Sequence, residues 1–232
     1  MTVLEAVDLA KLYTGGDGGT ITVLDGITLR VARGEMVAVI GASGAGKSTL
    51  LHLLGALDRP TRGAIRIAGE PIDGRSDEQL SVLRNRSIGF VFQFHHLLRE
   101  FTAAENVMMP MLIAGWEPGR ARKRADELLA RVGLSGRTQH RPAALSGGEQ
   151  QRTAVARALA MDPAVLLADE PSGNLDHANS ERLHDLFAEL SGDLEIAMVI
   201  ATHNRSLAAR AGRTLLLEDG RLTDVDVREA VP

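Results

Sequence analysis

The sequence of 232 residues contains no cysteine. Without a thiol, the chain can form no disulfide, no zinc site built on thiolates and no covalent intermediate on a cysteine nucleophile. These three kinds of chemistry are therefore excluded, and the composition is compatible with a reducing compartment.

Long hydrophobic runs are also missing. The longest, such as Met36–Ile40 and Ile196–Ala201, fall well short of the roughly 20 apolar residues that a membrane-spanning helix requires. The first residues, Met1–Glu5, lack the basic and apolar regions of a secretory signal. We therefore expect a chain that crosses no bilayer and stays where it is made.

An excess of positive charge is absent as well. The chain carries 26 Lys and Arg residues against 30 Asp and Glu residues, and this net charge of -4 provides no broad positive field for a nucleic acid or an anionic lipid surface. We expect no nucleic-acid partner. With 44% hydrophobic and 24% charged residues, the composition is typical of a folded globular domain rather than of a disordered chain.

The first part of the chain contains strand and helix patterns in alternation. Val23–Val31 alternates apolar and polar residues, as a strand with one wet face does, and Met36–Ile40 is continuously apolar, as a strand buried in a parallel sheet is. Ser48–Leu57 has apolar residues at helical spacing, and a short strand is expected at Ala64–Ala68. The predicted order is strand, strand, helix, strand.

The middle of the chain, residues 93–161, has mainly helical patterns, and strand patterns return after it. Near the end, Asp219-Gly220 can supply the positive φ angles of a hairpin turn. The elements expected here are helices at Arg120–Val132, Glu149–Ala160 and Glu181–Leu190, strands at Ala164–Ala168 and Ala197–Ala201, and a hairpin that pairs Leu215–Leu217 with Arg221-Leu222.

A phosphate-binding motif follows the first buried strand. Gly41–Ser48 matches G-x-x-x-x-G-K-[ST] at a junction between a strand and a helix. Glycines let the backbone and the helix N-terminus approach phosphates, Lys47 adds charge for the β- and γ-phosphates, and Ser48 offers a hydroxyl to Mg²⁺. The alternative, a glycine-rich turn that only starts a helix, needs neither Lys47 nor Ser48. The motif predicts nucleotide contacts at Gly41, Ser43, Gly44, Ala45, Gly46, Lys47, Ser48 and Thr49.

Two acids and a histidine follow the later buried strands. Asp169 and Glu170 come at the carboxyl end of one strand, where ligands of open α/β sheets bind, and His203 follows the next strand. Asp169 can hold Mg²⁺, Glu170 can act as general base toward an attacking water, and His203 can contact the γ-phosphate. The alternatives are solvated acids at a strand end and a structural histidine; the phosphate motif favours the catalytic interpretation.

The segment Leu145–Glu149, with the sequence LSGGE, precedes a helical pattern. Ser146 and Glu149 have the S-x-x-E spacing of a capping box, which explains the segment without any ligand. The same geometry exposes N–H groups at the positive end of the helix dipole, which suits a γ-phosphate. Both interpretations can hold together.

This run, followed by Gln150-Gln151-Arg152, resembles the signature of the ABC transporter ATPases, and the resemblance covers nearly the whole chain. It implies a head-to-tail homodimer in which the signature of one protomer closes over ATP held by the other. It also implies that Tyr13 stacks on adenine, that Gln93 links Mg²⁺ to the transmembrane partner and that Asp176 lies in a loop between protomers. The implied signature contacts are Ser146, Gly147, Gly148 and Glu149, the implied metal ligands are Ser48, Gln93 and Asp169, and the implied catalytic residues are Glu170, His203, Gln93 and Lys47.

Several segments further resemble the lipoprotein-releasing (LolD-type) group of this family. The resemblance implies ATP-driven release of lipoproteins from a bacterial inner membrane, with LolC/LolE-like integral-membrane subunits as partners. A macrolide or peptide exporter and a cell-division complex are alternatives, and a soluble ABC ATPase that acts on nucleic acid is disfavoured by the acidic charge. Gly173-Asn174 departs from the more general Ser-Ala form, with no consequence expected for ATP contacts. The matching segments are Phe92–Leu98, Glu105–Val107, His140–Pro142 and Asp169–Asp176.

The expected fold is α/β, with a P-loop NTPase (RecA-like) core on a mostly parallel sheet, an antiparallel β portion near the N-terminus and an inserted helical subdomain. We expect one ABC ATPase domain over residues 1–232, with the nucleotide-binding core in 1–92 and 162–232 and the helical subdomain in 93–161. ATP and Mg²⁺ are the expected cofactors. The expected location is the cytoplasmic face of the inner membrane, as a peripheral protein.

Overall fold

A six-stranded sheet forms the centre of the fold, which a computed structural model describes for residues 1–16 and 18–226. The strand order is β10-β9-β3-β8-β7-β6, and every neighbouring pair is parallel except the hairpin β9-β10. The strands are β3 (Met36–Ile40), β6 (Ile88–Phe92), β7 (Val165–Asp169), β8 (Ala197–Ala201), β9 (Arg213–Glu218) and β10 (Arg221–Val225).

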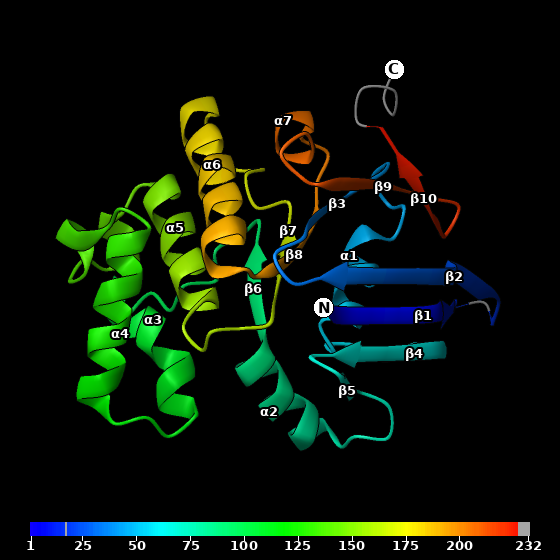
Figure 1. Cartoon of the computed structure of the whole chain (residues 1–232), viewed down its shortest axis with the longest axis horizontal. Helices are drawn as coiled ribbons and strands as arrows, with labels where there is room; N and C mark the ends of the chain where they lie inside the picture. Colours follow the sequence, from blue (N-terminus) through cyan, green and yellow to red (C-terminus); the bar gives the residue numbers. More distant parts are fainter. Residues whose placement is uncertain (17, 227–232) are drawn as a thin grey trace.

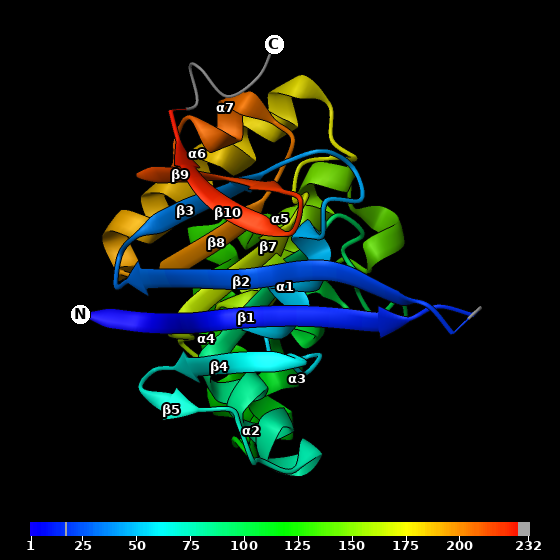
Figure 2. The ribbon, with the colours of Figure 1, turned by 90° about the vertical axis from the view of Figure 1, so that its right-hand side faces the viewer.

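A second sheet of four antiparallel strands has the order β2-β1-β4-β5. Figure 2 shows its two long strands running across the molecule in front of α1. The strands are β1 (Thr2–Thr14), β2 (Thr20–Ala32), β4 (Arg62–Ile67) and β5 (Glu70–Pro71).

Helix α1 (Lys47–Leu54) packs between the two sheets. Its buried leucines lie in one hydrophobic cluster with Ile65 of the antiparallel sheet and Leu167 of the central sheet. Because burial of apolar surface drives this packing, the position of α1 is fixed from both sides. The loop before α1 is therefore held at a defined place on the central sheet.

Further helices cover the opposite face of the central sheet (Figure 1). Strand β7 explains how both faces are buried: Val165 and Leu167 belong to the core around α1, whereas Leu166 and Ala168 belong to the core under the helices. α5 (Gly147–Ala158) and α6 (His177–Leu194) lie on this face, and α3 (Ala103–Ile113) and α4 (Pro118–Arg131) pack against α5. The other helical segments are α2 (Asp77–Ser87), α7 (Arg205–Ala208) and the 3₁₀ turns Ser135–Arg137 and Pro142–Ala144.

The fold class predicted from the sequence is confirmed: the central sheet is mostly parallel and the N-terminal sheet is antiparallel. The predicted hairpin turn is present, with φ of 47° at Asp219 and 74° at Gly220. The helix predicted to reach Leu57 was too long, because α1 ends at Leu54 with Gly55 as C-cap. The predicted segment 93–161 contains α3, α4 and α5, and its boundaries as a subdomain stay a prediction.

Strands β1 and β6 and helix α2 were not predicted. The sequence carried a signal for two of them. Ile88–Phe92 is a short apolar run with two aromatic residues, and α2 begins with a capping box formed by Ser76 and Gln79.

Within the part of the chain that the structure describes, no helix combines the length and the apolar character needed to cross a membrane.

The helix-covered core makes a prediction about stability. Phe187 of α6 is fully buried, so Phe187→Ala should lower the free energy of unfolding by about 3–5 kcal/mol, because the lost ring leaves a cavity. Phe94→Ala is the matched control, because Phe94 is 65% exposed, and its effect should stay within about 0.5 kcal/mol. Denaturant unfolding followed by circular dichroism measures both, and equal losses in the two variants would contradict this description of the core.

Candidate functional site

Four neighbouring parallel strands end at one edge of the central sheet. In the order β3, β8, β7, β6 they lead into Gly41, Thr202-His203, Glu170 and Gln93. Neighbouring parallel strands point the same way, so these connections meet at the carboxyl edge, where ligands of open α/β sheets bind. The structure therefore gathers the predicted phosphate loop, acids, histidine and glutamine on one side of the sheet.

The loop between β3 and α1 requires glycine at its first residue. Gly41 has φ of 154°, and a Cβ on it would lie 2.4 Å from the carbonyl oxygen of Leu217 in β9. The ammonium of Lys47 donates hydrogen bonds to the carbonyl oxygens of Gly41 (2.8 Å) and Ala42 (3.1 Å). The positive charge of Lys47 thus lies against the loop, while Ser43 and Gly44 face solvent.

The N-terminus of α1 has no side chain that caps it. Its N-cap residue is Gly46, which has no side chain that could accept a hydrogen bond from the first N–H groups, and the first turn contains no acid. By contrast, α2, α3 and α5 each begin with a capping box and an acid in the first turn. The first N–H groups of α1 and the positive end of its dipole are therefore suited to an anionic ligand, with Ser48 and Thr49 in the same turn.

A cavity of about 950 Å³ adjoins this loop. Gly44 and Ala45 line it from the loop, and Ile21 and Val23 line it from β2. Tyr13 lies on the neighbouring strand as the pairing partner of Ile21, and it is 43% exposed. The structure thus brings Tyr13 next to the cavity beside the phosphate loop, although its side chain does not line that cavity.

The ring of Tyr13 is held at its edge by a residue that the sequence gave no reason to select. The hydroxyl of Tyr13 donates a hydrogen bond to Asp58 (3.1 Å), which also accepts one from the ammonium of Lys11 (2.7 Å). That ammonium lies 4.9 Å from the centre of the Tyr13 ring. Asp58 therefore orients the only tyrosine of the chain.

Glu170 follows β7 with its backbone in the left-handed region, at φ of 44°. Such a conformation costs a residue with a side chain about 1–3 kcal/mol and is found mainly where a site needs it. The carboxylate accepts hydrogen bonds from the Thr202 hydroxyl (3.3 Å) and the His203 N–H (3.3 Å), and it lies 2.9 Å from Nδ1 of His203. The predicted base and histidine are thus in contact, and Thr202 is a contact that the sequence analysis missed.

Ser48, Gln93 and Asp169 supply oxygen atoms at the same edge of the sheet. Asp169 ends β7 and pairs with Phe92, the residue before Gln93. A hydroxyl, an amide oxygen and a carboxylate form a hard donor set of the kind that Mg²⁺ prefers, so the residues present fit that ion. Residues 1–16 and 18–226 contain no cluster of three or more His, Cys, Asp or Glu residues arranged to hold a metal.

The signature segment forms the predicted capping box at the start of α5. The N–H of Ser146 donates to Glu149 (2.8 Å), and the Ser146 hydroxyl accepts from the N–H of Glu149 (3.3 Å). Arg137 adds an ion pair to the same carboxylate at 2.8 Å. The backbone hydrogen bond from Ser146, helped by Arg137, lowers the pKa of Glu149 from its ordinary value to about 2.

Asp176 is the N-cap of α6 and connects that helix to the signature segment. Its carboxylate accepts hydrogen bonds from the backbone N–H (2.9 Å) and the side-chain amide (2.6 Å) of Asn179. A Cβ on Gly148 would lie 2.5 Å from the Asn179 side-chain oxygen, so any larger residue there would displace Asn179. Gly147 and Ser146 stay exposed at the start of α5. Asn179 was not predicted, because nothing local in the sequence points to this contact.

Known proteins of similar sequence point to one family. Residues 24–173 match the family model described as ABC transporter. The lipoprotein-releasing system ATP-binding protein LolD of Geobacter metallireducens is 54% identical over 221 residues, which cover 95% of this chain and 98% of that protein. The protein of the same name from Alcanivorax borkumensis is 51% identical over 220 residues, which cover 95% of this chain and 96% of that protein.

Solved structures of similar fold include the ATP-binding cassette MJ0796, a dimer in a post-hydrolysis state bound to ADP and Pi. It has a TM-score of 0.87 and 35% sequence identity, and the match covers 97% of this chain and 99% of that chain. The cbiO1 protein of Clostridium perfringens, part of an ABC transporter complex, has a TM-score of 0.86 and 30% identity, with coverage of 98% and 90%.

The low pKa of Glu149 predicts an acid-dependent loss of stability. The folded pKa of about 2 lies below the ordinary 4.5, so the ionised carboxylate stabilises the fold above pH 4.5, and this contribution is lost as the pH falls toward 2. Glu149→Gln should therefore lose less of its free energy of unfolding between about pH 5 and about pH 3 than the parent chain does.

Urea unfolding at the two pH values measures this difference. Glu189→Gln, on the exposed side of α6, is the matched substitution and should keep the pH dependence of the parent chain. An unchanged pH dependence in Glu149→Gln would contradict the prediction.

Proposed function

The chain belongs to the ABC transporter family of ATPases, and from this membership we propose that it drives the release of lipoproteins from a bacterial inner membrane. The observation that carries the proposal is similarity, over nearly the whole length, to ATP-binding proteins of lipoprotein-releasing systems. In this proposal the chain works on the cytoplasmic face of that membrane, bound to LolC/LolE-like integral-membrane subunits.

ATP is the substrate of the proposed reaction. Its phosphates lie on the loop Gly41–Gly46 and the uncapped start of α1, where Lys47 and Thr49 contact them, and its adenine stacks on Tyr13. The missing cap on α1 and the position of the Lys47 ammonium support this assignment. The hydrogen bond of the Tyr13 hydroxyl to Asp58 supports a fixed ring for stacking.

Mg²⁺ is the proposed metal, held by Ser48, Gln93 and Asp169. When bound, the ion neutralises charge on the phosphates and so lowers the barrier to phosphoryl transfer. The oxygen donors of these residues and their common place at the carboxyl edge of the sheet support the assignment.

Glu170 is the proposed general base. It accepts a proton from the water that attacks the γ-phosphorus; the bond to the bridging oxygen breaks, and ADP and phosphate form. His203 contacts the γ-phosphate and holds the carboxylate. The short contact between the two side chains and the unusual backbone angle of Glu170 support these roles.

The proposed active unit is a head-to-tail homodimer. The signature segment of one protomer, through Ser146 and Gly148, faces the γ-phosphate held by the other. Support comes from the exposed start of α5 and from the similar cassette MJ0796, which was solved as a dimer.

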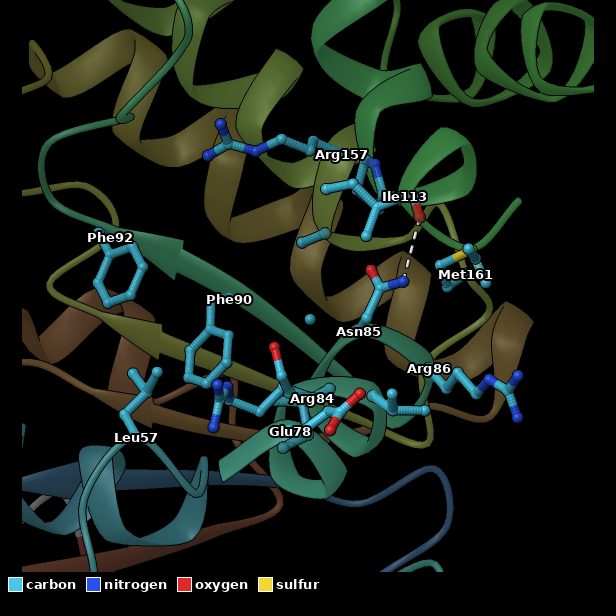
Figure 3. A pocket seen from close by; sticks show the side chains of 17 residues that line it. Leu57, Glu78, Arg84, Asn85, Arg86, Phe90, Phe92, Ile113, Arg157 and Met161 are labelled. Carbon is cyan, nitrogen blue, oxygen red and sulfur yellow. Dashed lines mark hydrogen bonds between the residues drawn. The ribbon is translucent and has the colours of Figure 1, made fainter. Parts of the chain in front are cut away.

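A groove between α2, β6, α3 and α5 is the proposed docking site for an integral-membrane subunit (Figure 3). Its volume is about 660 Å³, and three of its apolar residues are well exposed: Leu57 (46%), Val82 (49%) and Ile113 (71%). The side-chain amide of Asn85 in α2 donates a hydrogen bond of 3.1 Å to the carbonyl oxygen of Pro110 in α3. This bond joins the two helices that form opposite walls of the groove.

The occupant that fits this groove is a segment of the integral-membrane subunit with apolar residues and an acidic residue. Three arginines and one glutamate line the groove, so its charge is complementary to an acid, and Ile113 and Val82 offer apolar contacts; the charged residues are Arg84, Arg86, Arg157 and Glu78. Arg157 also donates hydrogen bonds to the carbonyl oxygens of His95 (2.8 Å) and His96 (2.7 Å), just after Gln93. A partner segment seated in the groove would therefore act on the segment that carries a proposed metal ligand.

Glu170→Gln tests the proposed chemistry. The amide cannot accept the proton of the attacking water, so ATP binding should be kept while kcat falls by at least about 100-fold and the closed dimer accumulates. Nucleotide binding, phosphate release and gel filtration with ATP measure the three outcomes. Lys47→Ala should differ by losing nucleotide binding, and full hydrolysis in Glu170→Gln would refute the general-base assignment.

The partner is tested by purifying the tagged chain from native membranes in mild detergent and identifying the bound proteins by mass spectrometry. We expect two related integral-membrane subunits with bound lipoprotein. Ile113→Asp should lower their recovery at least about ten-fold, because it puts a charge into the apolar contact. Val7→Asp, at a 42% exposed position of β1 outside the groove, is the matched control and should keep recovery.

Other partners would overturn parts of the proposal. A single exporter or cell-division subunit would move the function to that branch of the family. Nucleic acid or ribosomes without any membrane protein would refute the transport function. Equal recovery with Ile113→Asp and the parent chain would leave the partner assignment intact and refute the groove as its docking site.

A further inference from the structure

Gln93 and Asn174 form two reciprocal hydrogen bonds. The side-chain amide nitrogen of Gln93 donates to Oδ1 of Asn174 (3.0 Å), and the side-chain amide nitrogen of Asn174 donates to the backbone carbonyl of Gln93 (3.3 Å). The two residues are 81 positions apart and lie on the connections that follow β6 and β7. The side chain of Asn174 thus contacts both the backbone and the side chain of Gln93.

These two bonds fix the direction of both amides. The backbone carbonyl of Gln93 can only accept, so the Asn174 atom that faces it must be the nitrogen. Oδ1 of Asn174 must then accept, and the Gln93 atom that meets it must be its nitrogen. The remaining atom of the Gln93 amide, the carbonyl oxygen Oε1, stays outside the pair and is the hard donor that Mg²⁺ prefers.

Gly173 makes room for this pair. A Cβ on Gly173 would lie 3.0 Å from the side-chain nitrogen of Gln93, 3.2 Å from its Cδ and 3.4 Å from its Cγ. Any larger residue would crowd the Gln93 side chain and shift it by a few tenths of an ångström. Gly173 and Asn174 therefore both affect the position of the Gln93 side-chain amide: Gly173 leaves space for it, and Asn174 binds it.

The backbone around Gln93 is tied separately to α5. The buried Gln151 donates a hydrogen bond to the carbonyl of Phe92 (3.1 Å), and Arg157 binds the carbonyl oxygens of His95 and His96. These contacts hold the main chain on both sides of Gln93. The orientation of the Gln93 side chain is left to its own torsions, and Asn174 is the partner that restricts them.

We propose that Asn174 is a positioning residue that turns Oε1 of Gln93 toward the metal site, and that Gly173 is required for it to do so. This inference rests on the proposed role of Gln93 as a ligand of Mg²⁺. Asn174 needs no contact with nucleotide or metal; it acts through Gln93. The hydrogen bonds between Asn174 and Gln93 hold the proposed metal ligand in place before the ion binds. Contacts that fix the orientation of a metal ligand in this way strengthen metal binding.

A double-mutant cycle with Asn174→Ala, Gln93→Ala and the double variant tests the positioning role of Asn174. Each variant is made in the full chain, which also carries Glu170→Gln to stop hydrolysis. The probe is Mn²⁺ in place of Mg²⁺, with its affinity for the ATP-bound protein measured by electron paramagnetic resonance. Asn174→Ala should weaken Mn²⁺ binding about three- to ten-fold, as expected for the loss of one or two neutral hydrogen bonds. The double variant should match Gln93→Ala alone, because Asn174 acts through Gln93.

Three further measurements separate positioning from a general structural effect. ATP affinity in the presence of EDTA and the melting temperature should stay unchanged in Asn174→Ala. Gly173→Ala, which displaces Gln93 without removing a hydrogen-bonding group, should weaken Mn²⁺ binding in the same direction. Gln79→Ala is the matched amide control, because its side-chain bond is confined to the capping box of α2, and it should leave Mn²⁺ binding unchanged.

The outcomes distinguish failure of the inference from failure of the proposed function. If Gln93→Ala weakens Mn²⁺ binding but Asn174→Ala does not, or the two effects add, the positioning role is refuted and the metal assignment stands. If Gln93→Ala leaves Mn²⁺ binding unchanged, Gln93 is no ligand and both fail. Weaker ATP binding in EDTA or a lower melting temperature with Asn174→Ala would show a structural role and also refute the inference.

Discussion

The parallel pairing of β3, β8, β7 and β6 is the constraint on which the candidate site depends. Its register sets Asp169 beside both Phe92 and Ala201, so the residues that follow these three emerge next to one another. A shift of one residue would turn every side chain of a strand to the opposite face. Such a shift in β7 would exchange Val165 and Leu167 of one core with Leu166 and Ala168 of the other, so both cores would have to repack around side chains of different size, and packing therefore favours this register.

The parts of the site that sequence patterns could predict are those whose chemistry is local. The loop Gly41–Ser48 and the capping box of Ser146 and Glu149 depend on residues a few positions apart, and the structure has them where the patterns indicate. Strand β1 escaped prediction because its pairing contains several register shifts and Asp8 has φ of 50°, so the two-residue period is broken. Helix α2 was missed because only Leu80 and Leu83 are buried, which leaves little amphipathic pattern.

The other part of the site consists of contacts between segments that are far apart in the sequence, and no pattern of neighbouring residues predicts these contacts. Tyr13 and Asp58 are 45 positions apart, and Glu170 and Thr202 are 32 apart. Each pair meets only because helices and strands between them pack into the two cores. Asp58, Thr202 and Asn179 are chemically ordinary in the sequence, so their contacts with predicted site residues become visible only in the structure.

Gly173 and Asn174 illustrate the difference best. As a departure from the Ser-Ala form of the loop, they carried no expected consequence for ATP contacts. In the structure they form one feature: serine at position 173 would add a Cβ against the Gln93 side chain, and alanine at 174 would remove both hydrogen bonds to it. The first change would crowd the Gln93 side chain and the second would remove its partner, so both positions act on the orientation of the same amide. A chain with the Ser-Ala form must orient the corresponding glutamine by other contacts, and the Gly-Asn form is therefore a distinct solution to the same requirement.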